Sequence, residues 1–255
     1  MRLRLIRHAT LIVELGASTY LVDPMLAASE AGDPVPNTAN PRRNPLVELP
    51  MQQDELEDTL DALAAVFVTH LHSDHWDDPA IEQLNKDMPI FCQPNDTGSI
   101  KQAGFTQVMP VEESGVEWEG LNISLTGGRH GTGEMAKRNG PVSGFVIKSR
   151  SEPSLYIAGD TLWCPEFESA LETHRPAVVV VNAGAAEFIN SGPVTMDAKD
   201  VIRAALASPQ ARFVAVHMES MNHCVLTRVD LARAIEEAGL SERVLIPVDG
   251  ESLTF

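Results

Sequence analysis

The stretch Ala64-Ala65-Val66-Phe67-Val68-Thr69-His70-Leu71-His72-Ser73-Asp74-His75-Trp76-Asp77-Asp78-Pro79 decides the fold. Its first five residues are apolar, which predicts a buried strand. Asp78 followed by Pro79 is typical of an N-cap and the first turn of a helix. Three histidines and one aspartate therefore stand within six residues of each other, between the end of a strand and the start of a helix.

Metal binding accounts for this spacing. Side chains alternate along an extended segment, so His70 and His72 face the same way and can bind one ion. Asp74 and His75 follow the turn and face a neighbouring position. Imidazole nitrogen and carboxylate oxygen are ligands of zinc and similar divalent ions. The alternative is a polar loop that is rich in histidine, but four such side chains are costly to assemble at a strand end without a metal.

Three later segments bring further ligand-type side chains to strand ends. His130 lies between glycines that let the backbone bend, and it can supply a third nitrogen beside His70 and His72. Asp160 ends an apolar strand, where it either caps the next helix or points into the site. His217 closes the buried strand 212–216, and by itself it could equally bond to backbone groups.

The motif His70-x-His72-x-Asp74-His75 resembles the signature of the metallo-β-lactamase superfamily. The segments 6–11 and 21–24 resemble its ascorbate-6-phosphate lactonase-like branch. By its position alone, Asp23 could simply cap a turn. The resemblance implies instead that it accepts a hydrogen bond from a ligand histidine. It also implies two metal ions, with this set of ligands: His70, His72 and His130 on the first ion, Asp74, His75 and His217 on the second, and Asp160 bridging them.

The distribution of strands and helices indicates the α/β class. No linker divides the chain, so we expect residues 1–255 to form a single metallo-hydrolase domain, a four-layer αββα sandwich of two mixed β-sheets. Strands are expected at 3–7, 9–15, 18–23, 64–68, 89–91, 107–109, 115–126, 142–148, 154–158, 178–181, 212–216 and 244–247. Helices are expected at 53–61, 79–86, 96–103, 165–173, 197–206 and 227–238, and a glycine-bearing loop at 131–140.

The net charge and the composition of the chain limit the kinds of molecule that it is expected to bind. The net charge of −17 disfavours nucleic acid and anionic membrane surfaces, which are bound through Lys and Arg. No apolar run approaches the ~20 residues of a membrane span. The N-terminal residues alternate charged and apolar side chains, as a strand does and a signal peptide does not. The three cysteines, scattered and odd in number, indicate a reducing compartment, so we expect a cytoplasmic protein.

The breaker-rich segment 25–52 is expected to lie over the metal site. Its Arg42 and Arg43 either grip an anionic group of the substrate or form a solvated charge pair. His223 could replace His217 as a ligand, act as a general acid, stabilise an oxyanion or only pack. Asp74, His223 or a metal-bound water is expected to protonate the leaving group. Two interpretations of His8 are open: its ring is hydrogen-bonded to backbone groups near the end of the sheet, or it lines the pocket.

A hydrolase is the function that these features favour. A water between the ions becomes the nucleophile, because a divalent cation lowers its pKa from ~15.7 towards ~7. The sequence contains no Gly-x-Ser-x-Gly motif, so it does not favour a mechanism with a covalent intermediate on serine. The expected substrate is a small ester, most specifically a lactone; the alternatives are a phosphodiesterase and a non-catalytic metal sensor or scaffold. Two divalent ions are expected, Zn²⁺ first, although Mn²⁺ and Fe²⁺ suit the same ligands. A small molecule is the expected partner, and homo-oligomerisation is left open.

Overall fold

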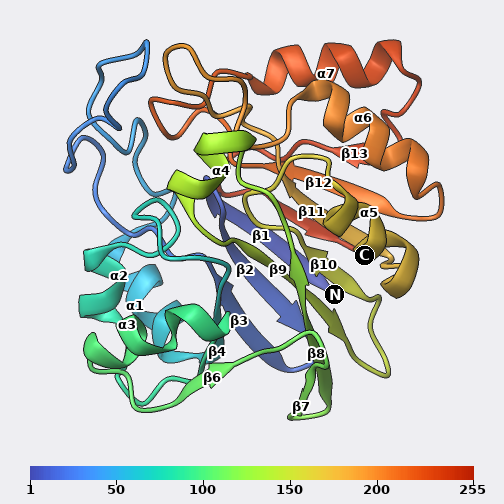
Figure 1. The fold of residues 1–255 in the computed structure, drawn as a ribbon. Coiled ribbons are helices and arrows are strands. Elements are labelled where there is room, and N and C mark those ends of the chain that lie inside the picture. Colours follow the sequence, from blue (N-terminus) through green and yellow to red (C-terminus); the bar gives the residue numbers. More distant parts are fainter.

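The first of two β-sheets is formed mainly by the N-terminal half of the chain (Figure 1). The computed structural model describes residues 1–255. Strands β1 to β3 of this sheet are antiparallel, and β3 to β6 are parallel. In spatial order the sheet contains β14 (Ser252–Thr254), β1 (Arg2–Arg7), β2 (Thr10–Leu15), β3 (Ser18–Val22), β4 (Leu63–Val68), β5 (Ile90–Cys92) and β6 (Val108–Pro110).

The second sheet is also mixed. Strands β10 to β13 are parallel, whereas β7 to β10 pair in antiparallel fashion. In spatial order it contains β13 (Val244–Leu245), β12 (Arg212–Val216), β11 (Val178–Asn182), β10 (Leu155–Ile157), β9 (Ser143–Lys148), β8 (Leu121–Gly127) and β7 (Val116–Trp118).

Three apolar cores hold four layers together. The central core joins the facing sheets, with Leu5 and Val13 from the first and Phe145 and Val180 from the second. A second core packs the first sheet against its helices, and a third does the same for the second sheet. The helices on the first sheet are α1 (Gln53–Asp61), α2 (Asp78–Gln83) and α3 (Thr97–Gln102), preceded by the 3₁₀ turn η1 (Pro94–Asp96); those on the second are α5 (Pro165–His174), α6 (Ala198–Ala207) and α7 (Arg228–Glu237).

The predicted αββα sandwich of two mixed sheets is confirmed. Two elements were not anticipated. Helix α4 (Gly133–Asn139) occupies the segment that we expected to be a loop, and β14 pairs with β1 at the edge of the first sheet. Helix α2 ends at Gln83, three residues earlier than predicted. No helix is both long enough and apolar enough to cross a membrane.

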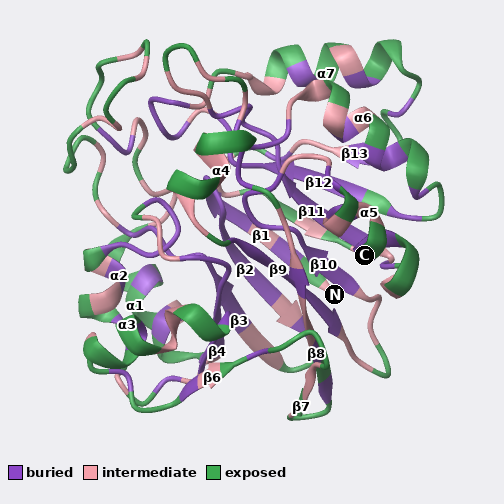
Figure 2. Cartoon of the chain, in the orientation of Figure 1, coloured by how far each residue is buried: buried purple, intermediate pink, exposed green.

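One end of the sandwich gathers the loops that follow several buried strands. Strands β1, β3 and β4 of the first sheet and β10 and β12 of the second all finish there, and α4 lies across this end of the molecule (Figure 1). The strands that lead to these loops are largely buried (Figure 2). Side chains that follow them are therefore presented by a rigid scaffold.

Candidate metal centre

Asp160 lies at the middle of a cluster of histidines. It follows β10 through Gly159, which has a φ of 67° and leaves no room for a Cβ beside the Ser143 carbonyl. Asn182 Nδ2 donates to Asp160 Oδ1 over 2.7 Å. The two carboxylate oxygens face four imidazole Nε2 atoms: His217 at 3.2 Å, His75 at 3.4 Å, His130 at 3.5 Å and His70 at 3.9 Å.

His70, His72 and His130 form one group of three nitrogens that lie close together. His70 Nε2 and His72 Nδ1 are 3.1 Å apart. His72 Nε2 donates to the carbonyl of Asn139, the last residue of α4, over 3.0 Å. His130 Nδ1 donates to the Val194 carbonyl over 2.8 Å. These outer partners assign the tautomers, so that a free lone pair of each ring faces the cluster.

Asp23 orients two of the histidines from behind. Its Oδ2 accepts from His75 Nδ1 over 2.8 Å and from the Thr69 hydroxyl over 2.7 Å. Because the Thr69 hydroxyl gives its proton to Asp23, its oxygen accepts from His70 Nδ1, which is 3.1 Å away. Both imidazoles therefore carry their protons on Nδ1 and turn Nε2 inward.

A second group contains Asp74, His75, His217 and also His8. The Nε2 atoms of His75 and His217 face each other at 3.2 Å. His217 Nδ1 contacts the Cys224 thiol at 3.5 Å. The His8 Nε2 atom lies 3.1 Å from Asp74 Oδ2, and the His8 ring lies against the His217 ring with centroids 3.6 Å apart.

The buried groups of the centre differ in the direction in which their surroundings shift their pKa values. Burial lowers the pKa of His70 well below its usual value, which keeps that ring neutral. Burial also opposes charge on His75, but the carboxylates of Asp160, Asp23 and Asp74 outweigh it and raise its pKa well above the usual value. His217 and His75 overcome the burial of Asp160 and hold its pKa well below the usual range. The centre thus holds ionised carboxylate and attracts positive charge.

The donor set fits divalent metal ions. Lone pairs of His70 and His72 point at each other, as do those of His75 and His217, and such pairs repel unless a cation or a proton lies between them. Five imidazoles with two ionised carboxylates, each held by an outer hydrogen bond, match the nitrogen and oxygen ligands of Zn²⁺ and related ions.

The structure brings the seven predicted ligands to this centre, with Asp23 behind them, and it adds His8, whose role the sequence left open, to the second group. His223, Arg42 and Arg43 lie outside the donor groups. His223 Nε2 is 3.8 Å from Asp74 Oδ2 and belongs to neither of the two donor groups. Arg42 and Arg43 are turned to their own loop. Arg43 donates to the Glu30 and Ala31 carbonyls and to the Asp33 carboxylate. The Arg42 guanidinium lies 3.5 Å from the Leu46 carbonyl, and the Arg42 backbone N–H donates to Asn40 Oδ1 over 3.1 Å.

Two residues that the sequence did not single out hold that loop in place. Arg7 is fully buried and donates to the carbonyls of Met25, Ala27 and Val47. Burial lowers the pKa of Arg7 to about 10, so it stays charged at neutral pH. Asn222, from the other sheet, makes five side-chain hydrogen bonds to this loop, whose partners are Val35 N, Val35 O, the Thr38 hydroxyl, Asn40 O and Asn44 Nδ2.

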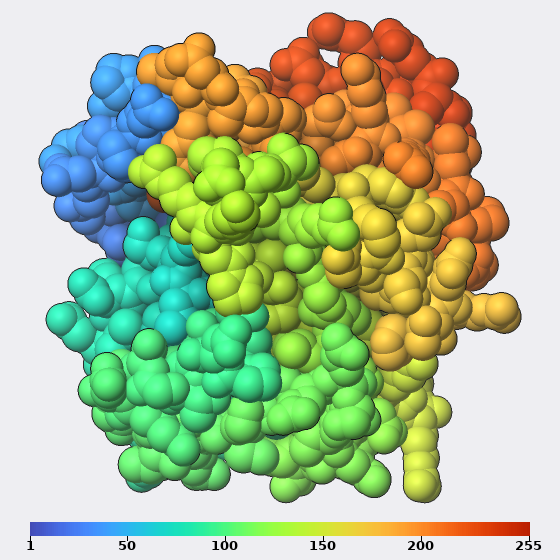
Figure 3. Space-filling model, in the orientation of Figure 1, coloured from blue at the N-terminus to red at the C-terminus, as the bar shows by residue number.

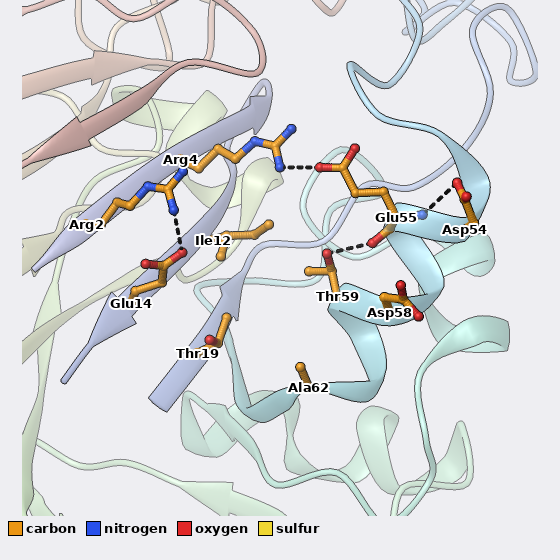
Figure 4. Close-up of a pocket in the computed structure, with 10 residues that line it drawn as sticks. All are labelled: Arg2, Arg4, Ile12, Glu14, Thr19, Asp54, Glu55, Asp58, Thr59 and Ala62. Atoms are coloured by element: carbon orange, nitrogen blue, oxygen red, sulfur yellow. Dashed lines mark hydrogen bonds and ion pairs between the residues drawn. The ribbon is translucent and has the colours of Figure 1, made fainter. Parts of the chain in front are cut away.

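A pocket between β1, β2, β3 and α1 offers no competing site (Figure 4). It has a volume of about 450 Å³ and contains no histidine. Arg2 is paired with Glu14 over 3.1 Å, and Arg4 with Glu55 over 2.6 Å. Its cationic side chains are thus neutralised by neighbours.

Comparisons with known proteins place the chain. Residues 20–218 match the model of the Beta-lactamase superfamily domain. UPF0173 protein YddR of Bacillus subtilis is 39% identical, over the whole of both chains. The structure of isothiocyanate hydrolase from Delia radicum gut bacteria is 39% identical, with a TM-score of 0.93 over 100% of this chain and 99% of that one.

A possible metal-dependent hydrolase from Veillonella parvula is 34% identical, and its structure superimposes with a TM-score of 0.95 over 100% of this chain and 99% of that one. The matched region of the family model includes all seven predicted metal ligands. The chain belongs to the metallo-β-lactamase superfamily.

Proposed function

We propose that this protein is a metal-dependent hydrolase that attacks an electrophilic carbon of a small, uncharged substrate. The observation that carries the proposal is the position of Asp160, whose carboxylate lies within 3.9 Å of four imidazole Nε2 atoms. Relatives described as metal-dependent hydrolases support it, among them a UPF0173 protein of Azorhizobium caulinodans that is 22% identical over 99% of both chains.

The proposed ligands follow the two groups of donors. His70, His72 and His130 would hold one ion, Asp74, His75 and His217 a second, and Asp160 would be shared by both. When bound there, divalent ions lower the pKa of water and stabilise negative charge that develops on a substrate. Zn²⁺ is the ion we expect, and Mn²⁺ and Fe²⁺ suit the same donors.

The chain supplies proton transfer and orientation. Asp74 Oδ2 lies 3.1 Å from His8 Nε2, a contact that holds the carboxylate beside the second donor group. His223 Nε2 is too far from Asp74 for a direct hydrogen bond and remains available to a substrate atom. Because burial lowers the pKa of His223 to about 4, its ring is neutral near pH 7, and we assign His223 to holding the substrate through a hydrogen bond. We assign Asp74 to accepting a proton from water and returning it to the leaving group.

The substrate we favour is an isothiocyanate. The relative from Delia radicum gut bacteria bears the name isothiocyanate hydrolase and is similar along the entire chain. In this reaction water oxygen bonds to the central carbon of R–N=C=S, the bond from that carbon to nitrogen breaks, and the products are R–NH₂ and O=C=S. Both water protons end on nitrogen, which requires groups that accept and return a proton at the site.

A small lactone is the second candidate. It is favoured by the segments 6–11 and 21–24, which resemble the ascorbate-6-phosphate lactonase-like branch, and its carbonyl carbon is open to the same attack. A phosphodiester is less suited. Both arginines nominated to grip an anion bond instead to the loop that carries them.

The test is turnover of one isothiocyanate, one γ-lactone and bis-(p-nitrophenyl) phosphate by protein that is purified, chelated or reloaded with Zn²⁺, Mn²⁺ or Fe²⁺. We expect isothiocyanate turnover that disappears on chelation and returns with metal. Metal analysis should give two ions per chain. Asp160→Asn should reduce turnover at least ~100-fold, whereas Asp58→Asn, in α1, should not.

Turnover that survives chelation would refute the proposed mechanism. Tight metal binding without turnover of any of the three substrates would favour the sensor or scaffold alternative. Preferential hydrolysis of the lactone or of the phosphodiester would replace the isothiocyanate assignment.

A further inference from the structure

A second cavity lies directly beside the candidate metal centre. It has a volume of about 180 Å³. Three segments line it, residues 38–40 of the long loop, residues 187–191 and residues 222–225. In the space-filling view the blue loop and the orange segment near residue 190 meet at the upper left, beside α4 (Figure 3).

Two residues that line this cavity also contact predicted metal ligands. His223 lines the cavity, and its Nε2 atom lies 3.8 Å from Asp74 Oδ2. Cys224 also lines it, and its thiol contacts His217 Nδ1 at 3.5 Å. His223 Nδ1 is buried and has no hydrogen-bond partner. A molecule in the cavity would therefore lie against groups that contact both Asp74 and His217.

Five of the twelve lining residues are hydrophobic, the others are polar, and the lining is close to neutral. Ile189 and Val225 are exposed large hydrophobic residues, 51% and 49% accessible, and the backbone N–H of each donates to a carbonyl of another segment. The Phe188 ring lies 6.2 Å from the His223 ring. Glu187 is the one charged residue of the lining apart from histidine, so the cavity disfavours an anionic group.

The cavity is held open by hydrogen bonds between its three segments. Ile189 N donates to the Asn37 carbonyl over 2.8 Å, and Glu187 N donates to the His223 carbonyl over 2.9 Å. Asn222 Nδ2 bonds to the Asn40 carbonyl and the Thr38 hydroxyl, both over 2.7 Å. The walls are thus tied together in the ligand-free chain, as a preformed binding site requires.

We propose that this cavity binds the apolar organic substituent of the substrate, and that Ile189 and Val225 set the preferred size of that substituent. The inference rests on the proposed hydrolase function and adds the substrate class, compounds with a neutral alkyl or aryl group. Its volume is sufficient for a phenyl ring, since a cavity of about 150 Å³ accommodates benzene.

The experiment compares methyl and 2-phenylethyl isothiocyanate in the zinc-loaded full chain. Val225→Phe should fill the cavity and lower kcat/KM for the phenylethyl compound about tenfold relative to that for the methyl compound, because the cavity then excludes the larger group. Ile189→Ala should shift the same ratio by removing apolar contact. The matched control is Val229→Phe, since Val229 is 67% exposed in α7, outside the cavity.

A readout that does not need turnover is binding of 2-phenylethanol, followed by ligand-observed NMR. Binding that is lost in Val225→Phe and kept in Val229→Phe supports the cavity even if no isothiocyanate is hydrolysed, in which case only the proposed function fails. An unchanged kcat/KM ratio together with unchanged 2-phenylethanol binding in Val225→Phe overturns the inference. Equal effects of Val225→Phe and Val229→Phe overturn it as well.

Discussion

His8 and Asp74 are joined by a contact of 3.1 Å between His8 Nε2 and Asp74 Oδ2, although 66 positions separate them in the chain. Both are buried. The backbone reinforces the arrangement, because the His8 carbonyl accepts from His217 N over 2.8 Å. His8 thus connects the end of β1 with two residues of the second donor group and holds the Asp74 carboxylate in one orientation.

Replacing His8 should therefore impair catalysis more than substrate binding. The His8→Phe variant keeps an aromatic ring but lacks the nitrogen that contacts Asp74. We expect kcat to fall ~10- to 100-fold with little change in KM. Steady-state kinetics and metal analysis check this. His174→Gln is the control, because His174 lies at the end of α5, away from the centre. Wild-type kcat in His8→Phe would show that the contact is not used.

Much of the site could be predicted because its ligands are encoded locally. His70, His72, Asp74 and His75 follow one buried strand at a spacing that suits metal coordination and is costly without it. Asp160 and His217 each close an apolar strand, and the resemblance gave them roles that the residues alone left open. The strands themselves were recognisable from runs such as Val178–Val181, since periodicity and β-branched residues agree there.

The sequence left the role of His8 open and did not reveal α4, in both cases for physical reasons. His8, Asp23 and His217 all adopt positive φ, at 59°, 44° and 69°, which no local sequence preference of these residues announces. The direction in which His8 points depends on how the two sheets face each other. Helix α4 is bounded by glycines and buries no residue, so it lacks the apolar periodicity that reveals helices.

Asp23→Asn should weaken metal binding. The Asp23 carboxylate accepts from Thr69 N, the Thr69 hydroxyl and His75 Nδ1, and an amide would present an N–H to at least one of these donors. We expect zinc affinity to fall ~10- to 100-fold, measured by competition with a chromophoric chelator. Asp33→Asn, on the exposed loop, should leave affinity unchanged, and equal affinities of the two variants would contradict the orienting role.

His223 should make the metal-free protein less stable in acid. Burial lowers the pKa of His223 from 6.5 to about 4. Below pH 6.5 the unfolded chain takes up a proton at this position that the folded chain takes up only near pH 4. The free energy of unfolding should therefore decrease by up to ~3 kcal/mol as the pH falls through this window.

Urea denaturation of chelated wild-type protein and of His223→Leu, at several pH values between 4 and 7, measures this contribution. The variant should lose less stability across the window, and the difference between the two curves should level off below pH 4. Parallel curves would show that His223 titrates normally in the folded chain. Histidines that do not interact with His223 contribute equally to both proteins and cancel in the difference.

Asn222→Ala should destabilise the long loop of residues 25–52. The substitution removes five hydrogen bonds, one buried and four partly buried, for which we expect a loss of ~2–4 kcal/mol in the free energy of unfolding. It should also expose residues 35–44 to protease at low concentration. Asn95→Ala is the matched control, because Asn95 is exposed in η1. Protease resistance equal to that of the wild type would contradict this assignment.

The long loop is fastened from two directions, by Arg7 at the end of β1 and by Asn222 beyond β12. We expect the loop to form the rim of the entrance to the site. Because the loop is attached to both sheets of the sandwich, this rim should stay in place when a substrate binds. Admission should then depend on the fixed width of that entrance, so that turnover responds to the bulk of the molecule entering and hardly at all to solvent viscosity.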